Sequence, residues 1–113
     1  MTDVYISNPI VKVKEGSFFI ATAYFRSDAG AALAPTTAKY RVDCLTTGKE
    51  LKAWTSLTPA TSINIGILPA WNAIQWQSNR REKKQLIVAS DPDTTTQVRD
   101  KITWIVDNID NVS

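Results

Sequence analysis

The stretch Ser17–Arg26, with the sequence SFFIATAYFR, decides the fold class of this chain. Phe19, Ala21, Ala23 and Phe25 recur in it at every second position. Because successive side chains of a β-strand point to opposite faces, this spacing predicts a strand with one buried face. An amphipathic helix would repeat its apolar residues every three or four positions instead. The rest of the chain must then supply the strands that cover this face.

Turn-forming residues punctuate the chain on both sides of this strand, about every dozen positions. Short alternating segments lie between these turns, a spacing typical of β-sandwiches and barrels. The further predicted strands are an opening one around Ile10–Val13 and the segments Ala38–Leu45, Glu50–Leu57, Ser62–Leu68, Gln85–Ala89 and Lys101–Asp107. About seven strands in 113 residues predict an all-β, immunoglobulin-like antiparallel β-sandwich that forms one domain, residues 1–113.

The last segment fits two descriptions. Val98, Ile102, Ile105 and Ile109 are spaced as one face of a helix, whereas alternate residues from Ile102 to Val106 are spaced as one face of a strand. We favour the strand, because a succession of Ile, Thr, Trp, Ile and Val suits a pleated surface better than a helix.

The predicted core consists of the residues at the inward positions of the strongest strands. In Glu50–Leu57 the apolar residues leave strict alternation, so we expect a bulge or bend there. Cys44, the one cysteine, falls in the apolar rhythm of a strand and is expected to be a buried small hydrophobe and not a reactive thiol. The predicted core residues are Phe19, Phe25, Tyr40, Val42, Trp54, Ile65 and Val88.

The charge and the start of the chain bear on its partners and location. The formal charge of +2 is close to neutral, whereas nucleic-acid and membrane-surface partners usually need a clear basic excess. The sequence shows no secretory signal and no apolar run near the roughly 20 residues that cross a bilayer. We therefore expect a soluble protein made in a cytoplasm, with neither nucleic acid nor membrane as its partner.

The residue types argue against catalysis. The chain has no His, which removes the commonest general base and the commonest metal ligand. With one Cys and no His, a zinc site is close to excluded, and the sequence has neither a G-x-S-x-G elbow nor a Gly-rich phosphate loop. We expect no enzyme activity, no cofactor and no metal. Asp91 and Asp93, which flank Pro92, are interpreted as turn residues, with calcium binding as the alternative.

Two features are candidates for binding a partner. Trp71 and Trp76 lie outside the clean strands, where a loop aromatic can anchor a partner, although Trp is also a common core residue. A basic cluster follows at a strand start, where a solvated turn is the simpler interpretation and contact with an acidic neighbour the functional one. The predicted partner-binding residues are Trp71, Trp76, Arg80, Arg81, Lys83 and Lys84.

The order of these segments resembles a known group of proteins. SFFIATAYFRSDAGAALAPTT, AKYRVDCLTTGKELKAWTSL, SINIGIL and NRREKKQLIVAS follow one another as in small immunoglobulin-like or fibronectin type III-like proteins of phages and prophages. The matching positions, all turn or packing residues, are Phe25, Asp28, Gly30, Pro35, Tyr40, Val42, Thr47, Gly48, Leu51, Trp54 and Glu82.

The resemblance implies a function. Members of this group are accessory virion proteins, such as capsid decoration or cement proteins and tail-associated modules. A non-enzymatic virion component, made in the host cytoplasm, is therefore expected to brace capsid or tail subunits or to pair with further copies of itself. The missing Cys pair of antibody domains agrees with assembly in a cytoplasm. The alternative is an adhesion or carbohydrate-binding module that uses exposed Trp71 or Trp76.

Overall fold

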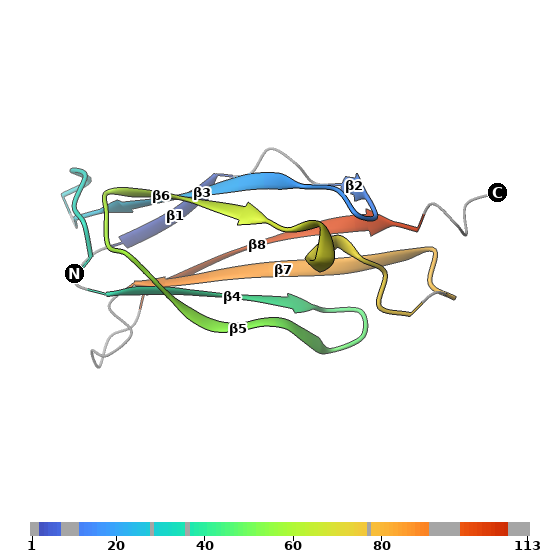
Figure 1. Cartoon of the computed structure of the whole chain (residues 1–113). Coiled ribbons are helices and arrows are strands. Elements are labelled where there is room, and N and C mark those ends of the chain that lie inside the picture. Colours follow the sequence, from blue (N-terminus) through green and yellow to red (C-terminus); the bar gives the residue numbers. More distant parts are fainter. Residues whose placement is uncertain are drawn as a thin grey trace.

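A computed structural model describes residues 3–7, 12–27, 29–35, 37–76, 78–90 and 98–108. Within these ranges the chain forms strands and one short 3₁₀ turn (Figure 1). No helix in the described ranges is long and apolar enough to cross a membrane. The elements are β1 (Asp3–Ser7), β2 (Lys12–Lys14), β3 (Phe19–Arg26), β4 (Ala38–Cys44), β5 (Lys49–Leu57), β6 (Ser62–Ile67), η1 (Pro69–Asn72), β7 (Arg81–Ser90) and β8 (Val98–Asp107).

The strands form two sheets that lie as two layers along the length of the molecule (Figure 1). One sheet has the order β1-β3-β6 and the other the order β2-β8-β7-β4-β5. Neighbouring strands are antiparallel except β2 and β8, which are parallel. The two sheets confirm the predicted all-β sandwich, with one parallel pair where the prediction had antiparallel strands.

The predicted number of strands differs from the observed one at the N-terminal side. The predicted opening strand around Ile10–Val13 corresponds to β2, which begins at Lys12, and β1 was not predicted. β1 pairs with β3 in one sheet, whereas β2 pairs with β8 in the other. The chain therefore enters both layers before β3 begins.

The choice of a strand for the last segment is confirmed by β8. Trp104 and Val106 are buried and Ile102 packs against the core, so alternate residues face inward as predicted. β7 is longer than its predicted counterpart Gln85–Ala89, because it begins at Arg81 and includes most of the basic cluster.

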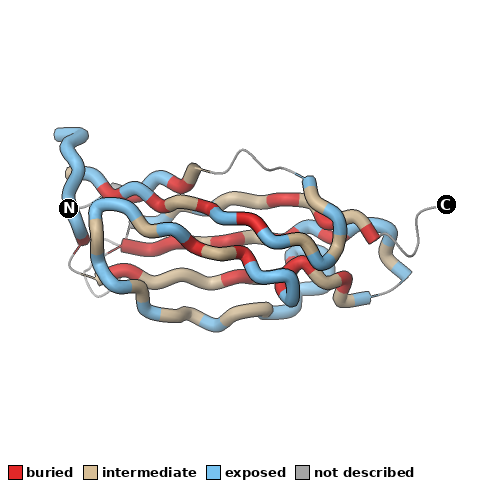
Figure 2. The backbone as a smooth tube through the Cα atoms, turned by 45° about the horizontal axis from the view of Figure 1, so that its top comes forward, coloured by how far each residue is buried: buried red, intermediate tan, exposed pale blue. Residues whose placement is uncertain are grey.

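The core lies between the two sheets, and buried positions alternate along the strands (Figure 2). Of the predicted core residues, Phe19, Phe25, Val42, Ile65 and Val88 are buried, and Tyr40 is half-buried against the core. The expected burial of Cys44 is also confirmed. Alternation along a pleated strand therefore predicts most of this core correctly.

The prediction for Trp54 is wrong. The pairing of β4 with β5 shifts register on both sides of Val42, and this irregularity turns Trp54 out of the core. Its ring instead lies 4.8 Å from Lys39 Nζ and 5.9 Å from Arg99 Cζ. The predicted bulge is thus present, and it reverses the face on which the aromatic residue lies.

Trp104 joins the core to the loop after β6. Its ring meets Phe19 edge to face at a centroid distance of 5.2 Å, and its Nε1–H donates to Asn72 Oδ1 at 2.7 Å. Asn72 Nδ2 in turn donates to the carbonyl oxygen of Ser17 at 2.7 Å. Because Asn72 is fully buried, these bonds hold η1 against the turn between β2 and β3.

Candidate functional site

The loop after β6 and the start of β7 carry all the predicted partner-binding residues. This segment lies at the end of the sandwich where β8 terminates (Figure 1). The structure divides the residues of this segment into an inward and an outward set, so they do not form one continuous patch.

Trp71 belongs to the core. It is 8% exposed, and its ring centroid lies 6.2 Å from that of Tyr40. In η1 the N–H of Trp71 donates to the carbonyl oxygen of Leu68 at 3.0 Å, a turn that directs the side chain toward the sheets. The expectation of a surface anchor is therefore wrong for Trp71, whereas Trp76 is 65% exposed and does present its ring to solvent.

Lys84 is also an inward residue. Its side chain is 0% exposed, so its assignment to a surface cluster is wrong. The reason is strand alternation: Arg81 and Lys83 point outward from β7, whereas Glu82 and Lys84 point inward. Lys84 Nζ donates to Glu82 Oε1 and to the carbonyl oxygen of Ala73, each at 2.9 Å. A buried ammonium group needs such partners.

Glu82 fastens the loop that carries Trp76. Its carboxylate accepts hydrogen bonds from the N–H of Gln75 at 2.7 Å, the N–H of Trp76 at 3.0 Å and Asn79 Nδ2 at 3.0 Å. Cys44 Sγ lies 3.7 Å from Glu82 Oε1 on the other side. The buried carboxylate thereby holds the loop through the backbone at Gln75 and Trp76 and through the side chain of Asn79.

The hydrogen bonds also set the charge of Glu82. Burial alone would raise the pKa of this carboxyl group, because a low-dielectric environment disfavours the charged form. The bonds from the N–H of Gln75, from Lys84, from Asn79 and from the N–H of Trp76 outweigh burial and lower the pKa from 4.5 to about 2. Glu82 is therefore ionised throughout the physiological range.

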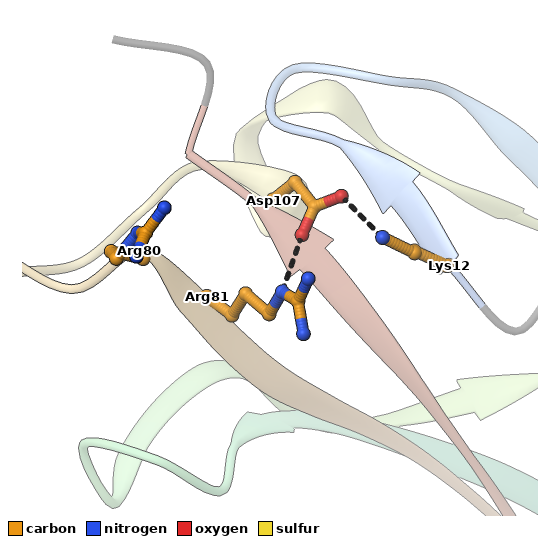
Figure 3. Close-up of a pocket in the computed structure, with 4 residues that line it drawn as sticks. All are labelled: Lys12, Arg80, Arg81 and Asp107. Atoms are coloured by element: carbon orange, nitrogen blue, oxygen red, sulfur yellow. Dashed lines mark hydrogen bonds and ion pairs between the residues drawn. The ribbon is translucent and has the colours of Figure 1, made fainter. Parts of the chain in front are cut away.

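A basic hollow of about 440 Å³ lies at this end of the sandwich, lined by Lys12, Arg80, Arg81 and Asp107 (Figure 3). Asp107 lies between two cations: its Oδ1 is 3.0 Å from Arg81 Nε and its Oδ2 is 3.1 Å from Lys12 Nζ. With three cationic residues around one carboxylate, the lining carries an excess of positive charge that suits an anionic group.

The hollow contains residues that sequence reasoning missed. The parallel pairing of β2 with β8 brings Lys12 beside Ile105 and places it near Asp107, far away in the sequence. Only the register of this pairing could have identified Lys12, because nothing in its local sequence marks it. Arg80 and Arg81 were predicted, and both are exposed here.

No group of three or more His, Cys, Asp or Glu side chains that could hold a metal ion occurs in the described part of the chain. Asp91 and Asp93, on which the calcium alternative rests, lie outside the described residues.

Comparison of the chain with protein-family models, with curated proteins and with solved structures finds no match.

Proposed function

We propose that the protein is a non-enzymatic interaction module, and specifically an accessory component of a phage virion that contacts a capsid or tail subunit. The observation that carries the proposal is Trp76, a large aromatic side chain that is 65% exposed on a loop held by Glu82. The virion location is inferred from the resemblance of the sequence to phage immunoglobulin-like proteins. Further copies of this chain are proposed as additional partners.

The docking surface is the Trp76 end, defined as Trp76, Arg80, Arg81 and Lys12. Holding the loop backbone in place before binding reduces the entropy lost on association, and Trp and Arg are among the residues that most often dominate binding energy. The positive lining of the hollow speeds capture of an acidic partner. The partner surface should therefore offer an apolar recess beside carboxylate groups.

The experiment is mass spectrometry of purified particles from the phage or prophage that encodes the chain. The chain should be present in wild-type particles and depleted in the variants Trp76→Ala and Arg80→Glu. Two matched controls lie on the opposite sheet: Tyr5→Ala removes another exposed aromatic, and Arg26→Glu reverses another exposed cation. Particles that never contain the chain would contradict the virion role. Equal depletion by the controls would contradict the Trp76 end.

The second candidate function is binding of carbohydrate, which exposed aromatic side chains favour. Besides Trp76, Tyr5 and Tyr24 are exposed on the outer face of β1 and β3, with ring centroids 6.4 Å apart at 27°. Sugar rings stack on such aromatic faces. A glycan array separates the functions, because a sugar signal that is lost in Trp76→Ala or Tyr24→Ala would favour the carbohydrate-binding module.

A further inference from the structure

The outer face of the five-stranded sheet is basic across its central strands β8, β7 and β4. In the strand register, Lys39 of β4 and Arg99 of β8 lie on either side of Ala89 of β7. Residues paired across antiparallel strands share one face of a sheet, so this row lies on one side.

The neighbouring row repeats the arrangement, with Arg41 and Lys101 on either side of Ile87. Lys83 also points outward and lies near the start of β7. We call Lys39, Arg41, Arg99, Lys101 and Lys83 the basic face.

Among the residues that the structure describes, carboxylates form ion pairs with Arg41 of the basic face. Asp43 and Glu50 both pair with Arg41, at 2.9 and 3.2 Å. Asp100 borders a hollow of about 440 Å³ beside Ile87 and Lys101, and its two oxygens accept the N–H groups of Ile6 and Lys101. In the described part of the chain, the excess of positive charge on the basic face therefore rests on Lys39, Lys83 and Lys101.

The opposite surface of the molecule has a different character. On the outer face of β1, β3 and β6, the outward residues are mostly uncharged, such as Tyr5, Ile20, Thr22 and Asn64. Arg26, at the end of β3, is the charged residue among the described side chains of that face. The net charge of +2 therefore conceals a separation in which positive charge gathers on one sheet.

We propose that the basic face binds an acidic polypeptide segment of a partner protein. Outward residues two apart on a strand are about 6.6–6.8 Å apart, and so are alternate side chains of an extended peptide. An extended segment laid along the strands therefore places alternate carboxylates opposite the Lys39–Arg99 row and the Arg41–Lys101 row. In the second row, Ile87 lies between Arg41 and Lys101 and offers a contact for an apolar side chain of the ligand.

The aromatic residue on this side favours a polypeptide over a single-stranded nucleic acid. Proteins that bind single strands stack bases on open aromatic rings. The ring of Trp54 already has Lys39 Nζ at 4.8 Å and Arg99 Cζ at 5.9 Å. Carboxylates need only charge-assisted contacts with the cations, which this arrangement supplies. The inference goes beyond the proposed function, since it gives the module a second surface with which to join two partners.

The experiment uses the whole chain and fluorescein-labelled poly-L-glutamate, with binding measured by fluorescence polarisation at low salt. Lys101→Glu should weaken binding roughly threefold, and Lys83→Glu combined with Lys101→Glu roughly tenfold. Arg26→Glu makes the same change of net charge on the opposite sheet and should leave binding close to wild type. Raising the salt concentration should weaken wild-type binding, because exposed charges are screened.

A second readout uses Trp54 as a local reporter. Poly-L-glutamate should draw Lys39 or Arg99 from the ring and change the tryptophan emission, and this change should be absent in Trp54→Phe. Three results would overturn the proposal: no binding of poly-L-glutamate at low salt, equal weakening by Arg26→Glu, or tighter binding of oligothymidylate through Lys101.

The Trp76→Ala variant separates this proposal from the proposed function. It should still bind poly-L-glutamate, because Trp76 is not part of the basic face. Absence of the Trp76→Ala variant from particles would report on the Trp76 end alone and not on the basic face. Loss of poly-L-glutamate binding in Lys101→Glu would report on the basic face alone and not on the Trp76 end.

Discussion

Glu82 Oε1 and Lys84 Nζ lie 2.9 Å apart on the inward side of β7, and both side chains are fully buried. Two residues apart on a strand, they face the same way, and each finds further partners in the loop before β7. The pair therefore joins the sheet to the loop that presents Trp76. Variants at either residue should change the free energy of unfolding.

Removing the acid should cost more than removing the base. Glu82→Leu leaves the N–H donors of the loop without their acceptor and the buried Lys84 ammonium group with no counter-ion and only the carbonyl oxygen of Ala73 as acceptor, so we expect a loss of about 3–5 kcal/mol in unfolding free energy. Lys84→Met leaves Glu82 with its other donors and should cost less. Urea unfolding of the two variants measures the difference, and equal losses would show that the loop donors do not depend on Glu82.

The stability of the protein should fall in acid. The pKa of Glu82 is lowered from 4.5 to about 2 in the folded state, so its contribution is fully present above pH 4.5 and is lost as the pH falls toward 2. The shift corresponds to on the order of 3 kcal/mol. Unfolding free energies measured from pH 6 to pH 2 should show this decline in wild type and in Glu50→Gln, a control in an exposed acid. A decline of the same size in Glu82→Gln would assign it to other groups.

Two tryptophans in one loop should behave oppositely. Trp71→Ala removes a core side chain and should lower the unfolding free energy by about 3–5 kcal/mol. Trp76→Ala changes an exposed ring and should stay within about 0.5 kcal/mol of wild type. Thermal unfolding followed by circular dichroism compares the two, and a large loss in Trp76→Ala would mean that its ring supports the fold.

The bond between Asn72 and Trp104 should contribute to stability as a buried pair. Asn72→Ala leaves the Nε1–H of Trp104 without its acceptor, at a cost of about 1–3 kcal/mol. In a Trp104→Phe background the same change should cost less, because the orphaned donor is no longer there. A double-mutant cycle measures this coupling, and a cycle with no coupling energy would contradict the role of the bond.

Regular alternation made most of the fold predictable. In Phe19–Arg26 every inward position is apolar, so the strand and its buried face follow from the residue types alone. β8 is predictable for the same reason, once its β-branched residues are given weight over its helical spacing. These segments needed no knowledge of their neighbours in space.

The errors arose where a specific contact or an irregular strand pairing overrides residue type. Glu82 and Lys84 occupy inward positions of β7, and only the loop donors and their mutual ion pair make that burial possible. Trp54 follows an irregularity in the pairing of β5 with β4, whose position the sequence does not specify. The basic face likewise depends on strand register, because Lys39 and Arg99 meet only across β7.

The parallel pairing of β2 with β8 has a mechanical consequence. β1 begins at one end of the sandwich and β8 terminates at the other, so tension between them runs along the strands (Figure 1). Parallel strands pulled from opposite ends slide past one another, and their hydrogen bonds bear the load together instead of opening one by one. Although β2 has three residues, we expect such tension to load its contacts along Ile105–Asp107 in shear. The ion pair between Lys12 and Asp107 adds to that resistance.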